Sequence, residues 1–88
     1  MANPGPLSRQ QLEALWNQRL QKAWDRYASA TAEFQKAVEE DGKRLTPSPD
    51  GITAVRRGRE VESVTRAEYM RVLKIFSDLV VHDKLPEE

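Results

Sequence analysis

The feature that most constrains this chain is an unbroken run from residue 8 to residue 41, which contains neither glycine nor proline. Ser8 suits the N-cap position, and Gln11 stands three residues later at the capping-box spacing. Gly42 follows the run, and glycine is the usual residue just past a helix end. We therefore predict one helix over residues 8–41, about 50 Å long, preceded by a flexible Pro/Gly leader at residues 1–7.

The apolar residues of this predicted helix recur alternately every four and three positions, which is the spacing of a coiled-coil seam. Ala23, Ala30 and Ala37 recur every seven residues beside that stripe, and a row of small side chains lets a second helix come close. We predict that the helix packs against other helices through a surface made of Leu12, Trp16, Leu20, Ala23, Trp24, Tyr27, Ala30, Phe34 and Ala37.

Residues 42–64 are rich in turn-forming residues, and we predict a connector there. The segment Ser48-Pro49-Asp50-Gly51 has a β-turn pattern. Residues 52–64 then form either a short β-hairpin around Arg57-Gly58-Arg59 or an irregular loop, and the sequence leaves both open. A second helix is predicted over residues 65–84, because Thr65 and Glu68 have capping-box spacing. Residues 8–88 are thus expected to form a single, mainly α-helical domain, a hairpin of one long and one shorter helix.

The unequal lengths of the two predicted helices suggest a partner. A helix of about 20 residues spans only about 30 Å, so it would leave part of the longer stripe uncovered, near Leu12, Leu15, Trp16 and Leu20. Exposed apolar patches that contain tryptophan are atypical of soluble monomers. We therefore expect a four-helix bundle made by a homodimer, or docking onto a larger protein. The alternative is a compact three-helix monomer in which the long helix breaks near residues 28–32.

Composition argues against catalysis and against stable metal or cofactor binding. The chain has fourteen basic and fourteen acidic residues and no cysteine, so it lacks both a global field and thiolate ligands. His82 is the only histidine, and Glu39-Glu40-Asp41 points in successive directions around a helix. We expect a non-enzymatic protein with no cofactor and no metal. The sequence shows neither a signal peptide nor an apolar run of membrane-spanning length, so we expect a cytoplasmic location.

The function most consistent with these features is a protein–protein interaction module that self-associates or serves as an adaptor, small subunit or chaperone-like protein. The alternative is a small nucleic-acid-binding accessory protein. In that case the predicted connector would place Arg56, Arg57 and Arg59 on phosphates, although Glu60 and Glu62 dilute the charge and no aromatic residue is interleaved for base stacking.

Overall fold

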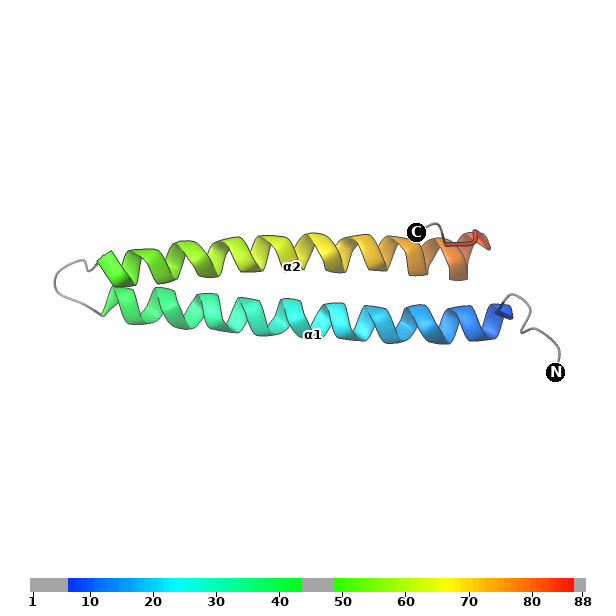
Figure 1. The fold of residues 1–88 in the computed structure, drawn as a ribbon, viewed down its shortest axis with the longest axis horizontal. Coiled ribbons are helices and arrows are strands. Elements are labelled where there is room, and N and C mark those ends of the chain that lie inside the picture. Colours follow the sequence, from blue (N-terminus) through cyan, green and yellow to red (C-terminus); the bar gives the residue numbers. More distant parts are fainter. Residues whose placement is uncertain (1–6, 44–48, 87–88) are drawn as a thin grey trace, which may run out of the picture.

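The computed structural model describes residues 7–43 and 49–86, and these form an antiparallel hairpin of two helices. Helix α1 spans Arg9–Gly42 and helix α2 spans Pro49–His82, each with 34 residues. The helices run side by side along their whole length, so that the start of α1 and the end of α2 lie at the same end of the molecule (Figure 1). The predicted mainly α hairpin is confirmed.

Helix α1 begins and ends where its sequence predicts, within a residue. The Ser8 hydroxyl accepts a hydrogen bond from the Gln11 amide at 3.2 Å, and the Gln11 side chain accepts one from the Ser8 amide at 2.9 Å. These two bonds satisfy backbone donors that the first turn of a helix leaves unpaired. The expected capping box is therefore present, and the rest of the predicted leader, residues 1–6, lies outside the described residues.

The predicted connector is wrong over most of its length. Residues 49–64 belong to α2, and neither a β-hairpin nor any other strand occurs within residues 7–43 and 49–86. Pro49 is the first helical residue, a position that proline favours because the amide it lacks would be unpaired there anyway. The turn pattern at 48–51 is thus, in its described part, the start of a helix. The second helix begins at 49 rather than 65 and ends at His82 rather than 84.

A single seam joins the helices, with positions spaced alternately by four and three on both sides. The buried residues of each helix fall on one line of this seam, separated by seven residues or a multiple of seven. In α1 these are Trp16, Ala23 and Ala30, and in α2 they are Gly51, Val72 and Leu79. The same seven-residue step through α2 also meets Gly58 and Thr65, both partly buried. The seam is therefore built from large side chains near the chain ends and from alanine and glycine near the turn.

Gly58 explains why a glycine lies in the middle of α2. A Cβ atom at Gly58 would lie 3.2 Å from the Phe34 Cα and 3.1 Å from the Phe34 Cδ1. Carbon atoms in good contact are about 3.5–4.0 Å apart, so the α2 backbone rests on α1 here with no room for a methyl group. Glycine costs about 1 kcal/mol of helix propensity relative to alanine. The close approach of the helices offsets this cost, which is why α2 does not stop at Gly58.

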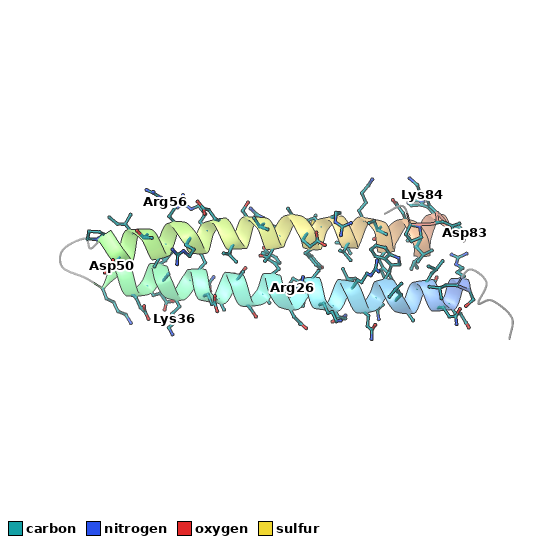
Figure 2. The ribbon with its side chains drawn as sticks, in the orientation of Figure 1. Arg26, Lys36, Asp50, Arg56, Asp83 and Lys84 are labelled. Atoms are coloured by element: carbon teal, nitrogen blue, oxygen red, sulfur yellow. The ribbon has the colours of Figure 1, made fainter. Side chains whose placement is uncertain are left out.

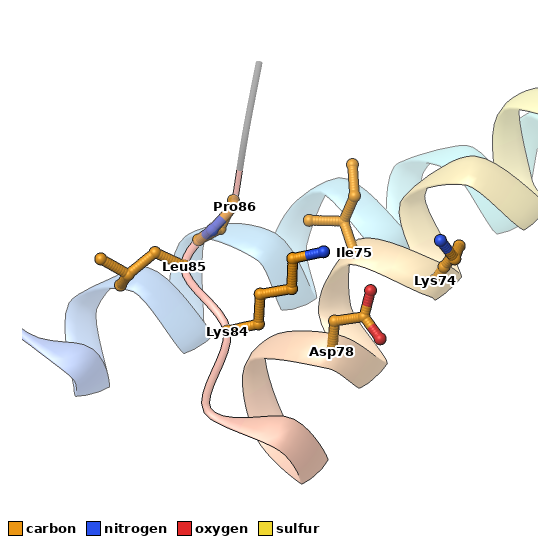
Figure 3. Close-up of a pocket in the computed structure, with 6 residues that line it drawn as sticks. All are labelled: Lys74, Ile75, Asp78, Lys84, Leu85 and Pro86. Carbon is orange, nitrogen blue, oxygen red and sulfur yellow. The ribbon is translucent and has the colours of Figure 1, made fainter.

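Arg9 ties the start of α1 to the end of α2. Its guanidinium donates hydrogen bonds to the carbonyls of Leu79 at 3.2 Å and Val80 at 3.4 Å, and it pairs with the Asp83 carboxylate. These carbonyls are among the last of the helix, which have no partner within it. Asp83 has a φ of 54°, which turns the chain. Figure 3 shows Lys84, Leu85 and Pro86 then running back beside α2, near Ile75 and Asp78.

The two helices are equally long, so the argument for a partner from unequal lengths is wrong. Trp16 is 2% exposed, and Leu12 and Leu20 pack partly buried against it. The region expected to stay uncovered is instead the best-filled part of the seam. The hairpin is nevertheless thin: its radius of gyration is 18.9 Å, against about 12 Å for a compact domain of this length.

Candidate interaction surface

The predicted contact residues of α1 divide into two sets. Trp16, Ala23 and Ala30 are buried in the seam within the hairpin itself, and Leu12 and Leu20 lie partly buried beside them. Trp16, Ala23 and Ala30 are buried against α2 of the same chain and are not available to another protein, whereas Leu12 and Leu20 are only partly buried. Of the remaining predicted residues, Ala37 continues the alanine row of the seam and is partly buried, Tyr27 and Phe34 are partly buried, and Trp24 is exposed.

An aromatic cluster marks the side of the hairpin on which Trp24 and Tyr27 lie. Trp24 is 46% exposed, although it is one of the two largest apolar side chains in the molecule. Its ring centroid lies 5.2 Å from that of Tyr69 in α2 and 5.9 Å from that of Tyr27. The Tyr27 and Tyr69 rings stack with centroids 6.0 Å apart. All three distances are favourable for aromatic pairs, and the cluster lies near the middle of both helices.

Seven-residue steps from this cluster carry an apolar surface along both helices, because residues seven apart share a helix face. We call this surface the open face. From Trp24 the steps reach Thr31 and the 44% exposed Val38, and from Tyr69 they reach Phe76 in one direction and Glu62 and then Val55 in the other. The adjoining row of α2 runs from Ile52 through Arg59 and Arg66 to Leu73 and Val80, so it is apolar at its two ends and basic at its middle. The open face comprises Leu20, Trp24, Tyr27, Thr31, Phe34 and Val38 in α1, and Ile52, Val55, Tyr69, Leu73, Phe76 and Val80 in α2.

Two features of the open face show that the hairpin alone does not cover it: exposed apolar side chains and a hydroxyl without a hydrogen-bond partner among the described residues. Both helices carry exposed large apolar side chains on this face. In α1 these are Trp24 and Val38, and in α2 they are Ile52 and Val80, near its two ends. The Thr31 hydroxyl is also shielded from solvent without a hydrogen-bond partner in the described part of the chain. Buried hydroxyls are normally paired. The open face thus resembles half of a protein interior.

The opposite side of the seam is covered by charged side chains. The Arg19 guanidinium lies 4.5 Å from the Trp16 ring centroid and shields that ring, a favourable cation–π geometry. Arg71 makes two hydrogen bonds to the Glu68 carboxylate, at 2.7 and 3.1 Å. The Arg71 hydrogen bond, with smaller contributions from the charges of Arg71 and Arg26, lowers the pKa of Glu68. The side opposite the open face thus carries these charged residues together with the exposed Val61 and Val64, and it has no aromatic cluster among the described residues.

The three arginines proposed for nucleic acid do not form a common surface. Arg56, Arg57 and Arg59 are exposed residues of α2, and successive helical positions differ by about 100° in direction. Arg56 points away from α1 (Figure 2). These arginines lie in a helix rather than in the predicted connector, and nucleic-acid binding stays a prediction.

The described residues contain no group of three or more His, Cys, Asp or Glu side chains suited to hold a metal ion. His82 is exposed in the last turn of α2. Neither α1 nor α2 has the combination of length and apolar character needed to cross a membrane.

Two residues of the open face in α2, Ile52 and Val55, were not predicted to lie on a helix, whereas Tyr69, Leu73, Phe76 and Val80 fall within the second helix predicted from the sequence. The signal was present: Val55, Tyr69 and Phe76 are separated by multiples of seven residues. Placing residues 42–64 in a connector broke that series. Comparison with protein-family models, curated proteins and solved structures gives no match, so the surface is interpreted from its own geometry.

Proposed function

We propose that this chain is a non-catalytic protein–protein interaction module whose open face is covered by helices of another polypeptide chain. The observation that supports this proposal is the exposed aromatic cluster at the centre of an apolar face, with Trp24 46% exposed. Tryptophan and tyrosine are enriched at the centres of interfaces, where a single large side chain contributes much of the binding energy. Large contiguous apolar patches on soluble proteins mark such sites.

The small core of the hairpin gives a second, independent support. The only large side chains that are buried are Trp16, Val72 and Leu79, since the other buried hydrophobic residues within the described ranges are alanines. Chains of this size without disulfides or metal ions commonly depend on assembly for their stability. A covering chain would add the burial of the open face to that small core, at about 25 cal/mol per Å² of apolar area.

The proposal is tested by Trp24→Asp, with Val64→Asp as the matched control. Val64 also lies near mid-length and is 69% exposed, but it stands on the charged side of the seam. If the open face is an interface, Trp24→Asp lowers both the assembled fraction in sedimentation and the melting temperature, whereas Val64→Asp changes neither appreciably. Equal behaviour of the two variants in both measurements would contradict the proposal, because a charge on Trp24 would then be no more costly than one on a solvated face.

A further inference from the structure

We infer that the chain covering the open face is a second copy of this protein, packed face to face with both inter-helix turns at the same end. This inference rests on the proposed function and adds the partner and its orientation. The available area fits a dimer. Helices of 34 residues are about 51 Å long, and two packed side by side are about 20 Å wide. The face then buries about 1,000 Å² on each copy, or about 2,000 Å² in total, as stable dimers do.

Contacts within the hairpin fix which residues of α1 and α2 lie at the same level. Arg9 binds the carbonyl of Leu79, and Trp24 contacts Tyr69. At the other end of the hairpin, Phe34 lies against Gly58. The Trp24–Tyr69 and Phe34–Gly58 contacts agree to within one residue, and by the former Leu20 is level with Leu73 and Val38 is level with Val55, whereas the long Arg9 side chain reaches along the helix and does not set the level. Any full-length pairing of two open faces can therefore be compared residue by residue.

Two symmetric arrangements keep all neighbouring helices antiparallel. In the first, the two-fold axis runs along the hairpin, both turns lie together, and α1 of one copy lies over α2 of the other. In the second, the axis crosses the hairpin, the turns lie at opposite ends, and each helix lies over its own counterpart in the reverse direction. Both bury the same area, so the charges on the open face decide between them.

With the turns together, apolar side chains lie over apolar side chains, and charged side chains lie over groups that attract them. Leu20 lies over Leu73 of the second copy, Trp24 over Tyr69, and Val38 over Val55. The two arginines at the edge of the face, Arg66 and Arg59, lie over the aromatic rings of Tyr27 and Phe34, an attractive combination. Thr31 lies over Glu62, so the unpaired Thr31 hydroxyl gains a carboxylate to which it can donate.

The arrangement with the turns apart brings like charges together. Reversal about the middle of the hairpin places Glu13, which pairs with Arg9 of its own chain at 3.4 Å, close to Asp41 of the second copy, and this occurs twice because of the symmetry. Arg66 lies close to the middle of α2 and therefore meets its own counterpart. Like charges opposed across an interface cost several kcal/mol. The distribution of charge thus selects the arrangement with the turns together.

The test is a distance measurement between spin labels on Lys43→Cys, which is clean because the chain has no cysteine of its own. Lys43 is exposed at the turn end of α1. With the turns together, the two labels lie about 15–30 Å apart, and with the turns apart they lie about 50 Å apart. As a control, labelled Lys43→Cys protein is mixed with Gln10→Cys protein, which carries its label at the other end of α1. The inference requires a long distance between the label at position 43 of one copy and the label at position 10 of the other.

The outcomes separate the inference from the proposed function. A short distance between the labels at position 43 of the two copies, together with a long distance between positions 43 and 10, supports both the orientation and the interaction function. A dimer with the reverse pattern overturns the orientation and leaves the interaction function standing. A protein that sediments as a 10.1 kDa monomer at micromolar concentration, without dipolar coupling between labels, overturns the second copy as the covering chain. If Trp24→Asp then also behaves like Val64→Asp, the interaction function falls with it.

Discussion

Gly58→Ala tests the closest contact between the helices. In the structure, an added Cβ lies 3.1 Å from the Phe34 Cδ1 and 3.2 Å from the Phe34 Cα. The ring can rotate away, but the Cα can move only if α1 moves as a whole. Since carbon contacts relax to about 3.5–4.0 Å, the helices must separate by several tenths of an ångström around this point, and the neighbouring alanine contacts loosen with them.

Two opposed contributions decide whether Gly58→Ala stabilises or destabilises the hairpin. Replacing glycine by alanine inside a helix gains about 1 kcal/mol of helix propensity. Overpacking by one methyl group in a tight contact costs about 1–3 kcal/mol. Because the obstacle is backbone rather than the end of a flexible side chain, we expect the larger part of that cost. The net loss is then about 1 kcal/mol, which lowers the melting temperature by about 4–8 °C in a domain of this size.

Thermal unfolding followed by circular dichroism at one fixed protein concentration measures this effect, because assembly would make the midpoint depend on concentration. Gly42→Ala is the control, since a Cβ at Gly42 meets no atom within 4 Å. We expect Gly42→Ala to leave the midpoint unchanged or slightly raised. A melting temperature that rises in Gly58→Ala would refute the reasoning, because it would mean that helix propensity outweighs the contact and that α1 and α2 are not held at this separation.

Two further predictions concern the polar contacts of the hairpin. Arg9→Ala removes the hydrogen bonds to the last carbonyls of α2, at Leu79 and Val80, so we expect a loss of up to about 1 kcal/mol and faster amide exchange in the last turn of α2; exchange there equal to that of the wild type would contradict this role. The pKa of Glu68 lies below its ordinary value of 4.5 because Arg71 donates to the charged carboxylate, so its contribution to stability is present above about pH 4.5 and is lost as the pH falls through the lowered value. A carboxyl titration by NMR should show the low pKa in the wild type and its return toward 4.5 in Arg71→Ala.

Much of α1 could be predicted because its signals are local. A capping box consists of two residues three positions apart, and the absence of glycine and proline over residues 8–41 leaves the helix no place to end. The seven-residue recurrence of Ala23, Ala30 and Ala37 also indicates the seam, although the sequence pattern alone favours the neighbouring stripe through Trp24 and Val38 as the main contact. Within the hairpin the alanine row faces α2, and the stripe through Trp24 and Val38 lies outside the seam.

The start of α2 could not be predicted from local propensity, because packing outweighs it there. Residues 49–58 contain a proline and two glycines, which by themselves indicate a turn. The proline occupies the first helical position, where it costs nothing. Both glycines lie on the line of the seam, where absent side chains let the helices approach. Only the seven-residue spacing from Gly51 to Leu79 distinguishes this pattern from a connector, and a single sequence does not say which reading is preferred.

The same glycines account for where the apolar surface lies. A seam position occupied by glycine or alanine leaves no room between the helices for a large side chain, so residues beside it lie over the edge of the seam rather than within it. Phe34 next to Gly58 is the clearest case, and Val38 and Val55 lie exposed or half-exposed in the same half of the molecule. Near the chain ends Trp16 and Leu79 fill the seam themselves. Thus the close packing that makes α2 a continuous helix also displaces apolar side chains outward. The width of the open face near the turn is a consequence of the glycines, and filling the seam at Gly58 should disturb the open face as well as the hairpin.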